Sequence, residues 1–594
     1  MKLATVIEPS DSIVADSLQS LLIKIEIGEE GIKKWGGFRL YIPPGWSLPQ
    51  LDHPQEPGYT TIEIKTKCEH RVKKNIYTGR WIAGEIIAGQ LSKGDTIEIC
   101  YGNTKAGGPG SYAPRVAVPK SIFQISVDQE GNYTYQDIDN SPCLKVIPGS
   151  VAELKAIIPS YRCASEIPVM VMAIDRSGNI AENSAISVEY KEGGEEKYKL
   201  DLKDGIGKVK LDLTEDKMVT HVHVSSGQLT CRSNPTKKGS HLLLWGDLHG
   251  HSNLSDGRFS PAEYFAYARD KGGLDFASLT DHDNVGSNSN VKEHSKLMGK
   301  ETWEQIKQAT NKANQPHQFV TLIGYEYTQI EMSTGGHRNI YYLDDDPPIF
   351  RSWDLESNTP TKLFNKLKKW KGRVIVIPHH PLNFMSREHD PDLQRLFEIY
   401  SMWGGSETAD DTCAFKHPVK YSPGGKSFIE MLNYDYRMGV VAGGDNHDSM
   451  PGFSKATDIW RKGKMAQRPG LTAVFVEEKT REALFAALYN RHCYATTGER
   501  ILLEFVIDGQ IMGSEVKAKK PYIKANVVGT CKLEQVQLVK NGLPVMDGKI
   551  SNEEAVLEYQ EEKDLPAQTY YYIRVIQQDG EKAWSSPIWV NPVE

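Results

Sequence analysis

The chain has 594 residues, which is too long for a single hydrophobic core and predicts two to four domains. Its 70 basic and 77 acidic residues give a net charge of -7, so the chain as a whole does not attract nucleic acid or an anionic membrane. No apolar run approaches the roughly 20 residues of a membrane-spanning helix.

The start of the chain and the cysteines bear on the cellular compartment. The first apolar stretch, Leu3–Ile7, is shorter than the roughly 7–15 residues of a signal-peptide core. The eight cysteines are scattered and form no CxxC pair, which is typical of free thiols. We therefore expect a cytoplasmic protein, although removal of a leader would leave the same pattern.

Short strands separated by turns are predicted for the first 238 residues. Thr60–Lys65 and Asp95–Cys100 alternate in the two-residue period of half-buried strands. A second unit begins near Pro148, and a hairpin is expected around Asp204 and Gly205. The pattern predicts an N-terminal β domain over 1–145 and an immunoglobulin-like β-sandwich over 146–238.

Apolar runs alternate with helical stretches between 239 and 500. LLLW is followed by the helical stretch PAEYFAYARDK and the run FASLT, and later come FVTLI, VIVIP and GVVAGG. Helices are expected at Thr361–Lys371, Lys426–Arg437 and Thr480–Asn490. This alternation predicts a mainly parallel sheet, open or closed, whereas 501–594 returns to strands and turns and forms a C-terminal β domain.

Polar side chains follow the apolar runs of the central region. They are Asp247, His249, His251 and Asp256 after LLLW, then Asp281, His282 and Asp283, then Glu326, then His379 and His380, and finally Asp445 and His447. Because the carboxyl ends of parallel strands meet at one rim, we expect these side chains to face one cavity.

The residue types at this rim predict a metal centre. Imidazole suits zinc, iron and manganese, and carboxylates offset the charge of a dication or bridge two ions. On extended backbone His249 and His251 point the same way, as do Asp445 and His447. The ligands outnumber the needs of one site, so two or three divalent ions (zinc, manganese or iron) are expected.

Five ordered motifs, DLHGHS, TDHD, GYE, PHH and GDNH, resemble the polymerase and histidinol phosphatase (PHP) superfamily of metal-dependent phosphoesterases over roughly 241–500. The segment RHCYATTGER (491–500) also resembles the end of such domains. The resemblance implies a distorted (β/α)7 barrel flanked by the β modules, hence a multidomain α/β plus β protein. By position it implies three ion sites: His249, His251, Glu326 and Asp445; Glu326, His379 and His337; and Asp256, His282 and His447.

Further residues are candidates for supporting roles. GGHRN places His337 as a candidate ligand and Arg338 as a candidate phosphate clamp, since arginine donates two parallel hydrogen bonds. His380 competes with His379 for the ligand position. Asp247 and Asp281 are expected to orient ligand imidazoles, and the rim candidates are Tyr327, Arg258 and Asp283.

The remaining histidines are expected to play no part in the site. THVHV contains a second His-x-His, His221 and His223, but no carboxylate follows it and its surroundings are those of a β-sandwich. The same expectation covers isolated histidines, which usually face solvent or make one backbone bond: His294, His317, His389, His417 and His492.

The expected function is hydrolysis of a phosphoester of a small or soluble substrate, including a phosphorylated glycan, by a metal-activated hydroxide. Asp256, His282 and His447 are candidates for proton transfer, with Arg338 on the phosphate. Two alternatives stay open: a metal-dependent hydrolase of a carbon-centred ester or glycan bond, and a non-catalytic carbohydrate-binding protein with a structural metal site. The sequence does not distinguish monoester from diester and does not predict the oligomeric state.

Overall fold

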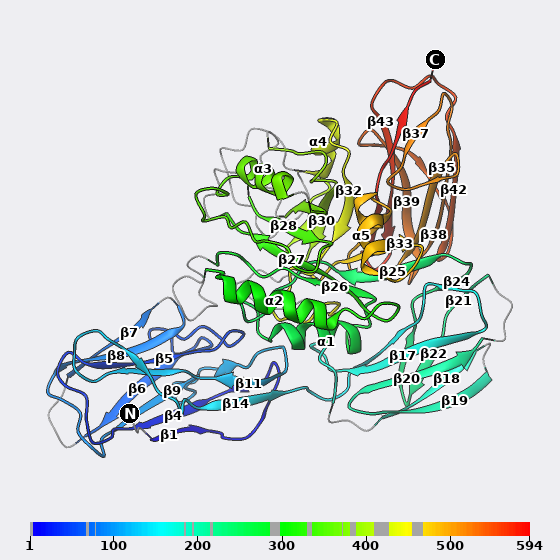
Figure 1. The fold of residues 1–594 in the computed structure, drawn as a ribbon. Helices are drawn as coiled ribbons and strands as arrows, with labels where there is room; N and C mark the ends of the chain where they lie inside the picture. The colour runs from blue at the N-terminus through cyan, green and yellow to red at the C-terminus, as the bar shows by residue number, and fades with distance from the viewer. Residues whose placement is uncertain are drawn as a thin grey trace.

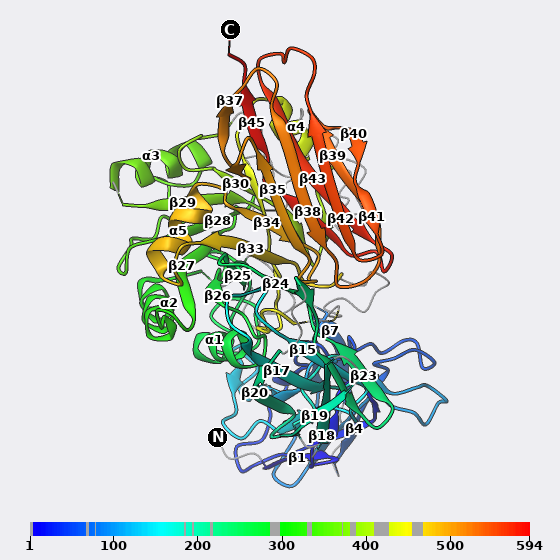
Figure 2. The same ribbon diagram turned by 90° about the vertical axis from the view of Figure 1, so that its right-hand side faces the viewer.

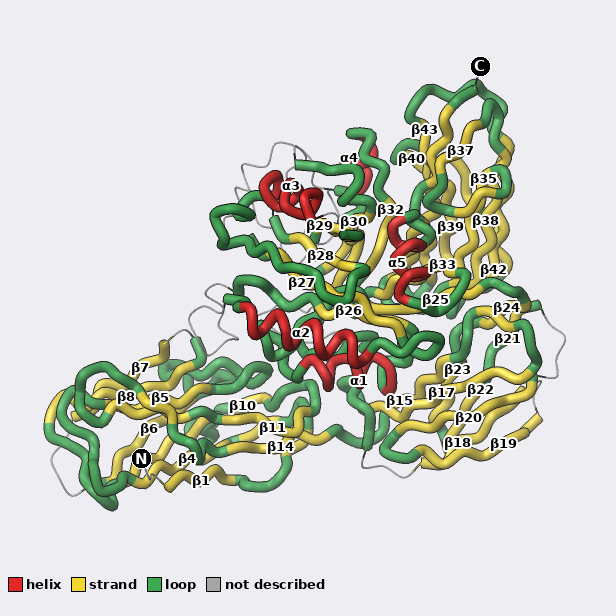
Figure 3. The backbone as a smooth tube through the Cα atoms, viewed as in Figure 1, coloured by secondary structure: helices red, strands yellow, loops and turns green. Residues whose placement is uncertain are grey.

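The computed structural model describes residues 4–66, 71–77, 79–182, 186–192, 195–213, 218–285, 297–329, 336–370, 372–379, 388–408, 427–453, 455 and 467–593. The described chain is mostly β-strand and contains five helices, all in the central region (Figure 3). Two β modules lie at one end of the molecule and a third lies at the other, with the central region between them (Figures 1 and 2).

The first module contains two main sheets. One has the strand order β1 (Ala4–Glu8), β4 (Leu21–Glu26), β9 (Thr96–Tyr101) and β6 (Thr60–Lys65). The other has the order β13 (Gln136–Asp137), β12 (Ile125–Asp128), β5 (Gly37–Tyr41), β8 (Trp81–Ala88) and β7 (Arg71–Tyr77). The alternating burial of β4, LLIKIE, leaves Leu21, Ile23 and Ile25 in the core between the sheets.

The second module also contains two facing antiparallel sheets. One consists of β15 (Glu153–Ile157), β17 (Glu166–Ile174) and β20 (Ile206–Asp212). The other consists of β19 (Glu195–Leu202), β18 (Ile186–Glu192), β22 (His223–Ser226) and β23 (Leu229–Arg232). Val171 and Val188 from opposite sheets lie in one shared core, as in a β-sandwich.

The central sheet begins with parallel pairs and then changes direction. β25 (Leu242–Asp247), β26 (Phe276–Leu279) and β27 (Val320–Tyr327) pair in parallel. β28 (Arg338–Tyr342) is antiparallel to both β27 and β29 (Val374–Pro378). β30 (Leu396–Ser401) and β32 (Gly439–Ala442) pair in parallel in a separate sheet with β31 (Gly404–Gly405).

The C-terminal module shares a sheet with the central region. β33 (Leu471–Val476) is antiparallel to β25 and to β34 (Cys493–Thr496), and β34 pairs with β44 (Lys582–Ser585). The sheet continues through β43 (Thr569–Gln577), β39 (Leu533–Lys540) and β40 (Leu543–Asp547), while β45 (Ile588–Asn591) pairs with β43 and with β37 (Glu515–Lys517). A facing sheet has the order β36 (Gln510–Ile511), β35 (Leu502–Ile507), β38 (Tyr522–Val528), β42 (Glu554–Gln560) and β41 (Lys549–Ser551).

The expectation of a distorted (β/α)7 barrel is wrong. In the described part of the chain the strand pairing runs from β29 through β25 to β40 without returning to β29, and β30 and β32 pair apart from it. Helices separate β25, β26 and β27, but β28 enters antiparallel and β33 leads into the C-terminal module. The chain is therefore mostly β, with an open mixed sheet at its centre.

The five helices largely follow the apolar periodicity. They are α1 (Pro261–Asp270), α2 (Lys300–Ala313), α3 (Pro360–Trp370), α4 (Phe428–Asn433) and α5 (Arg481–Tyr489), of which only α2 was not predicted. α1 begins with a capping box, because Ser260 accepts from the Glu263 amide and Glu263 accepts from the Ser260 amide. None of the helices in the described ranges is long and apolar enough to cross a membrane.

Candidate metal centre

Backbone pairing beyond the strand ends brings the predicted ligands together. The amide of Asp445 donates to the carbonyl of His249, and Gly250 and Asn446 form a parallel bridge. In the same way a bridge joins His282 to Glu326, and the His379 amide donates to the His337 carbonyl. Segments far apart in sequence thus present their side chains at one rim, as the sequence predicts for polar residues after strands.

Four side chains form the first donor set: His249, His251, Glu326 and Asp445, all buried. The His249 Nε2 atom lies 3.2 Å from Glu326 Oε2 and 3.4 Å from Asp445 Oδ1. The His251 Nε2 atom lies 3.0 Å from Asp445 Oδ1 and 3.5 Å from Glu326 Oε2. Two nitrogens and two oxygens therefore converge, as expected for the first ion site.

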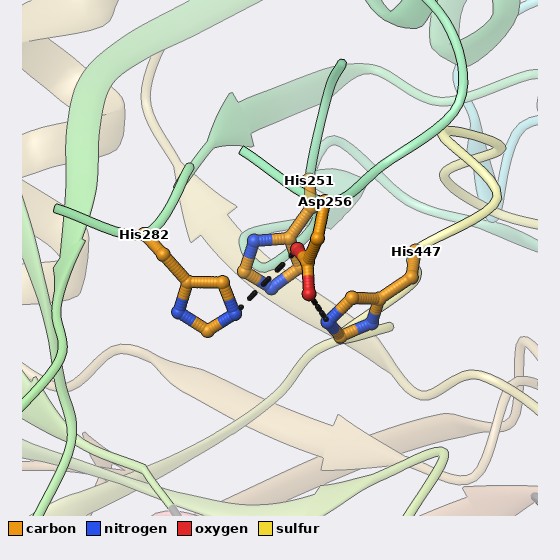
Figure 4. A group of neighbouring side chains, drawn as sticks. All are labelled: His251, Asp256, His282 and His447. Atoms are coloured by element: carbon orange, nitrogen blue, oxygen red, sulfur yellow. Dashed lines mark ion pairs between the residues drawn. The ribbon is translucent and has the colours of Figure 1, made fainter. Parts of the chain in front are cut away.

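A second donor set surrounds Asp256 and contains His251, His282 and His447 (Figure 4). Asp256 Oδ1 lies 3.7 Å from His282 Nε2, and Asp256 Oδ2 lies 3.4 Å from His447 Nε2. The structure thus brings together the three residues expected at the third ion site. His251 belongs to this set as well as to the first, so the two sets are adjacent.

The third donor set contains His282, Glu326 and His337. His337 Nδ1 lies 2.6 Å from Glu326 Oε1, which places GGHRN at the rim. His379, expected beside Glu326, is placed against Asp445 instead, with its Nε2 2.9 Å from Asp445 Oδ2. His380 lies outside the described residues.

The Nδ1 atom of four imidazoles has a polar partner that helps to orient the ring. Glu398 occupies the Nδ1 atoms of His249 and His379, at 2.9 and 2.7 Å. The Nδ1 of His447 lies 3.0 Å from the Asp445 carbonyl, which can only accept, so that nitrogen carries the proton. The Nδ1 of His282 lies 2.7 Å from Thr328 Oγ1, whose own proton goes to the Glu326 carbonyl. In the neutral form of such a ring, a proton on Nδ1 leaves the lone pair on Nε2.

Burial and mutual attraction set the charge states of the cluster. Burial alone would raise the pKa of Glu326, yet His282 and His337 hold that pKa well below its usual range. Burial opposes ionisation of Asp445 likewise, but His249 and His379 hold its pKa well below the usual range. Burial lowers the pKa of His379, but Glu398 and Asp445 outweigh it and raise the pKa to about 9. The neighbouring imidazoles therefore offset the effect of burial on the pKa of these two carboxylates.

The donor set fits divalent transition metals. Zinc binds imidazole nitrogen and carboxylate oxygen at about 2.0–2.2 Å, so two ligand atoms on a tetrahedral ion lie roughly 3.4 Å apart. The distances within the first donor set run from 3.0 to 3.5 Å between nitrogen and oxygen. The spacing and the residue types both match what such an ion requires.

Glu398 was missed by sequence reasoning. It lies in β30, LFEIYS, in which all six residues are buried, and it is 4% exposed. The sequence marks Glu398 only as a lone acidic residue within an apolar run, where a buried carboxylate needs a partner. The glycine at 443 makes room for it, since a Cβ there would lie 2.5 Å from His249 Cβ and 3.1 Å from Glu398 Oε2.

The aspartates expected to orient imidazoles bind backbone and hydroxyl groups instead. Asp247 accepts from the amides of His249 and Gly444, and burial raises its pKa to about 7. Asp281 accepts from the amide and hydroxyl of Ser252 and from the hydroxyl of Ser255. These bonds shape the loops that carry the ligands.

The structure does not bring Arg338 to the cluster. Arg338 pairs with Tyr327 and Asn339 pairs with Glu326, so Asn339 shares the face of Glu326 and Arg338 points to the opposite face. There Arg338 is fully buried, donates to the Gly336 carbonyl and lies 5.9 Å from the ring centre of Phe364 in α3. The side chain of Tyr327 shares this face and donates to the Ser357 carbonyl.

The other rim candidates have structural partners. Arg258 Nε lies 2.6 Å from Asp448 Oδ1, next to His447. Asp283 accepts from the Thr328 amide and from Ser352, and burial raises its pKa to about 7. Both hold segments beside a ligand.

The histidines expected to play no part are placed apart from the donor sets where the structure describes them. His221 Nδ1 lies 3.0 Å from the Ser233 carbonyl and His223 is exposed in the second module. His389 stacks on Tyr436. None of these three histidines belongs to a donor set of the described chain, and neither does His317 or His492. His294 and His417 lie outside the described residues.

Solvent exposure differs within the cluster. The side chains of His249 and Glu326 are 0% exposed and that of His379 is 2% exposed. By contrast, His337 is 24%, His447 13% and His282 12% exposed. A molecule that enters the site therefore meets these three imidazoles before the buried side chains.

Comparisons with known proteins match part of the cluster, and His249, His251 and Asp256 lie outside the matched ranges. Residues 274–384 and 438–532 match a family described as "Protein of unknown function (DUF3604)", and these ranges include His282, Glu326, His337, His379, Asp445 and His447. An uncharacterized protein of Chlamydia pneumoniae is 28% identical over 560 residues, covering 84% of each chain. An uncharacterized protein of Chlamydia trachomatis serovar D is 25% identical over 632 residues, covering 96% of this chain and 94% of that one.

Solved structures resemble the chain only weakly. A β-glucuronidase of Parabacteroides merdae covers 98% of this chain and 80% of its own at 9% identity, with a TM-score of 0.19. That score is too low to indicate a shared fold.

Proposed function

We propose that the chain is a metal-dependent hydrolase that cleaves a phosphoester of a small or soluble substrate. The observation that supports this most directly is the overlap of the three donor sets, which share His251, His282 and Glu326. Ions held in overlapping sets would lie close together, the arrangement that suits phosphoester chemistry.

We assign ion binding to the buried side chains of the cluster and proton transfer to its partly exposed imidazoles. The buried side chains of His249, Glu326 and Asp445 would hold ions. Bound divalent ions would lower the pKa of a water molecule and neutralise charge on phosphoryl oxygens. His282 and His447 are the partly exposed imidazoles, and either one would protonate a leaving oxygen only while its Nε2 atom does not bind an ion.

The limited access supports a small substrate group. Solvent reaches only the outer imidazoles, while the inner carboxylates are buried and anionic. An anionic phosphoryl group would be repelled by these carboxylates unless divalent ions were present. Activity should therefore depend strictly on metal.

A direct test uses the full chain loaded with Mn²⁺, Fe²⁺ or Zn²⁺ and assayed on p-nitrophenyl phosphate, bis-p-nitrophenyl phosphate and p-nitrophenyl acetate. We expect turnover of a phosphoester that a chelator abolishes and added metal restores. Failure of all three metals to support phosphoester turnover, or turnover of the acetate alone, would contradict the proposal.

The second His-x-His supplies the matched control. The double variant His249→Ala/His251→Ala should lose bound metal and all turnover. The double variant His221→Ala/His223→Ala should keep both, because these side chains lie in the second module, outside every donor set of the described chain. Elemental analysis of the purified variants measures the metal.

A further inference from the structure

One carboxylate contacts two imidazoles that serve different parts of the cluster. Glu398 Oε2 lies 2.9 Å from His249 Nδ1, and Glu398 Oε1 lies 2.7 Å from His379 Nδ1. The Nε2 atom of His249 faces Glu326 Oε2 and Asp445 Oδ1, whereas that of His379 faces Asp445 Oδ2. Glu398 therefore contacts both imidazoles whose Nε2 atoms face the oxygens of Asp445.

His249, His379 and Glu398 also lie close enough together to hold an ion, but their contacts have the arrangement of hydrogen bonds. Both rings direct Nε2 toward Asp445, so Nδ1 is the nitrogen that faces Glu398. The contacts at 2.9 and 2.7 Å, one to each oxygen of Glu398, match N–H···O hydrogen bonds to a carboxylate. Glu398 thus accepts an Nδ1 proton from each imidazole.

Accepting both protons has a chemical consequence for metal binding. A neutral imidazole carries one N–H, so a proton held on Nδ1 leaves the lone pair on Nε2. A carboxylate can accept from both rings at once, because it has no proton of its own at neutral pH. Glu398 is also 4% exposed, so water cannot readily replace it in this role.

We propose that Glu398 is a positioning residue that holds His249 and His379 in the tautomer and orientation that bind metal, with both Nε2 atoms directed toward Asp445. The proposal rests on the metal centre of the proposed function. It predicts that a change at Glu398 weakens metal binding even though Glu398 itself touches no ion.

The test compares Glu398→Gln with Glu407→Gln. Glutamine keeps the shape, but its NH₂ group would face one of the two Nδ1 atoms and favour a proton on Nε2 of that ring. Glu407 is the matched control: it is also 4% exposed and accepts from Tyr572, Arg574 and Trp584, none of which is a candidate ligand.

Metal affinity is measured by competition with a chelator, and the Co²⁺-substituted proteins are compared by their visible absorption spectra. We expect Glu398→Gln to bind metal roughly 10- to 100-fold more weakly, with a changed Co²⁺ spectrum. Glu407→Gln should change the unfolding temperature but neither the affinity nor the spectrum.

Two results would overturn the proposal. One is a folded Glu398→Gln variant with wild-type affinity and spectrum. The other is loss of one whole ion per chain with the remaining ions unaffected, which would make Glu398 a ligand. Failure of the wild-type chain to turn over phosphoesters while it binds metal would reject the proposed function but leave this inference standing.

Discussion

At the scale of single residues, Asp256 shows how a side chain gains its role from its neighbours. It follows a loop shaped by Asp281 and lies between His282 and His447. Burial alone would raise its pKa, but His447 and His282 hold the pKa below its usual range. The carboxylate is therefore ionised and available to an ion.

Replacing Asp256 with Asn should remove the ion that this set holds. The side chain keeps its shape but loses the negative charge that pairs with a dication. We expect the ratio of metal to protein to fall by about one ion per chain on elemental analysis. Asp175→Asn is the control, since that buried carboxylate of the second module accepts from the amides of Ser177 and Asn179. Equal metal loss in both variants would argue against a specific role for Asp256.

Acidification should weaken metal binding. In the metal-free protein, burial lowers the pKa of His379 and His447, but neighbouring carboxylates outweigh it and raise the pKa of both. A metal ion must displace these protons, so binding releases protons and the affinity falls as the pH falls. Chelator competition at pH 8, 7 and 6 measures this. An affinity that is constant or rises on acidification would contradict it.

At the scale of elements, strand β28 shows that moving one residue along a strand places the side chain on the opposite face of the sheet. His337 lies at the rim just before the strand, and Asn339 shares the face of Glu326. The two-residue period therefore turns Arg338 to the other face, against α3. The sequence contains this period, but the choice of Arg338 as a clamp rested on its chemistry alone.

We expect Arg338→Met to leave phosphoester turnover nearly unchanged. Loss of a true phosphate clamp would cost about 1.5–3 kcal/mol, or roughly 10- to 100-fold in kcat/KM. Because the structure buries Arg338 away from the cluster, the expected change is in the unfolding temperature. His337→Ala is the contrasting variant and should lower kcat/KM. A large drop in kcat/KM for Arg338→Met without a change in stability would instead support binding of phosphate by Arg338.

The grouping of the candidate ligands could be predicted from local pattern, whereas the strand pairing could not. His249, Glu326 and Asp445 each follow an apolar run, and that position alone brings them to one rim. The antiparallel entry of β28 and the pairing of β34 with β44 join distant segments, so no local period reveals them. The sequence does not predict the role of Glu398, because β30 (LFEIYS) contains none of the motifs.

At the scale of the whole molecule, the first β module packs against the loops that carry two candidate ligands, Asp256 and His447. Met450 and Phe453, just after His447, lie in the core of that module, and Phe259 packs against it. Gly45 of the same module approaches the Arg258 guanidinium, which pairs with Asp448. The module therefore braces the loops of Asp256 and His447 from outside the central sheet.

Gly45 tests whether this brace matters to the metal centre. A Cβ at Gly45 would lie 2.3 Å from Arg258 Nη2, so Gly45→Ala should push Arg258 away from Asp448 and loosen the loops beside Asp256 and His447. The residue has φ +84°, so alanine also costs about 1–2 kcal/mol of backbone strain.

Gly94→Ala separates strain from bracing. Gly94 lies in the same module at φ +83°, and a Cβ there would meet nothing within 4 Å. Both variants should lose stability through backbone strain, and Gly45→Ala should lose more through its contact with Arg258, as measured by thermal unfolding of the metal-free proteins. Only Gly45→Ala should lose affinity for the ion near Asp256, measured by chelator titration of the metal-loaded proteins. Equal affinity in the two variants would show that the module and the metal centre are energetically independent, because the strain is matched and only the contact with Arg258 differs.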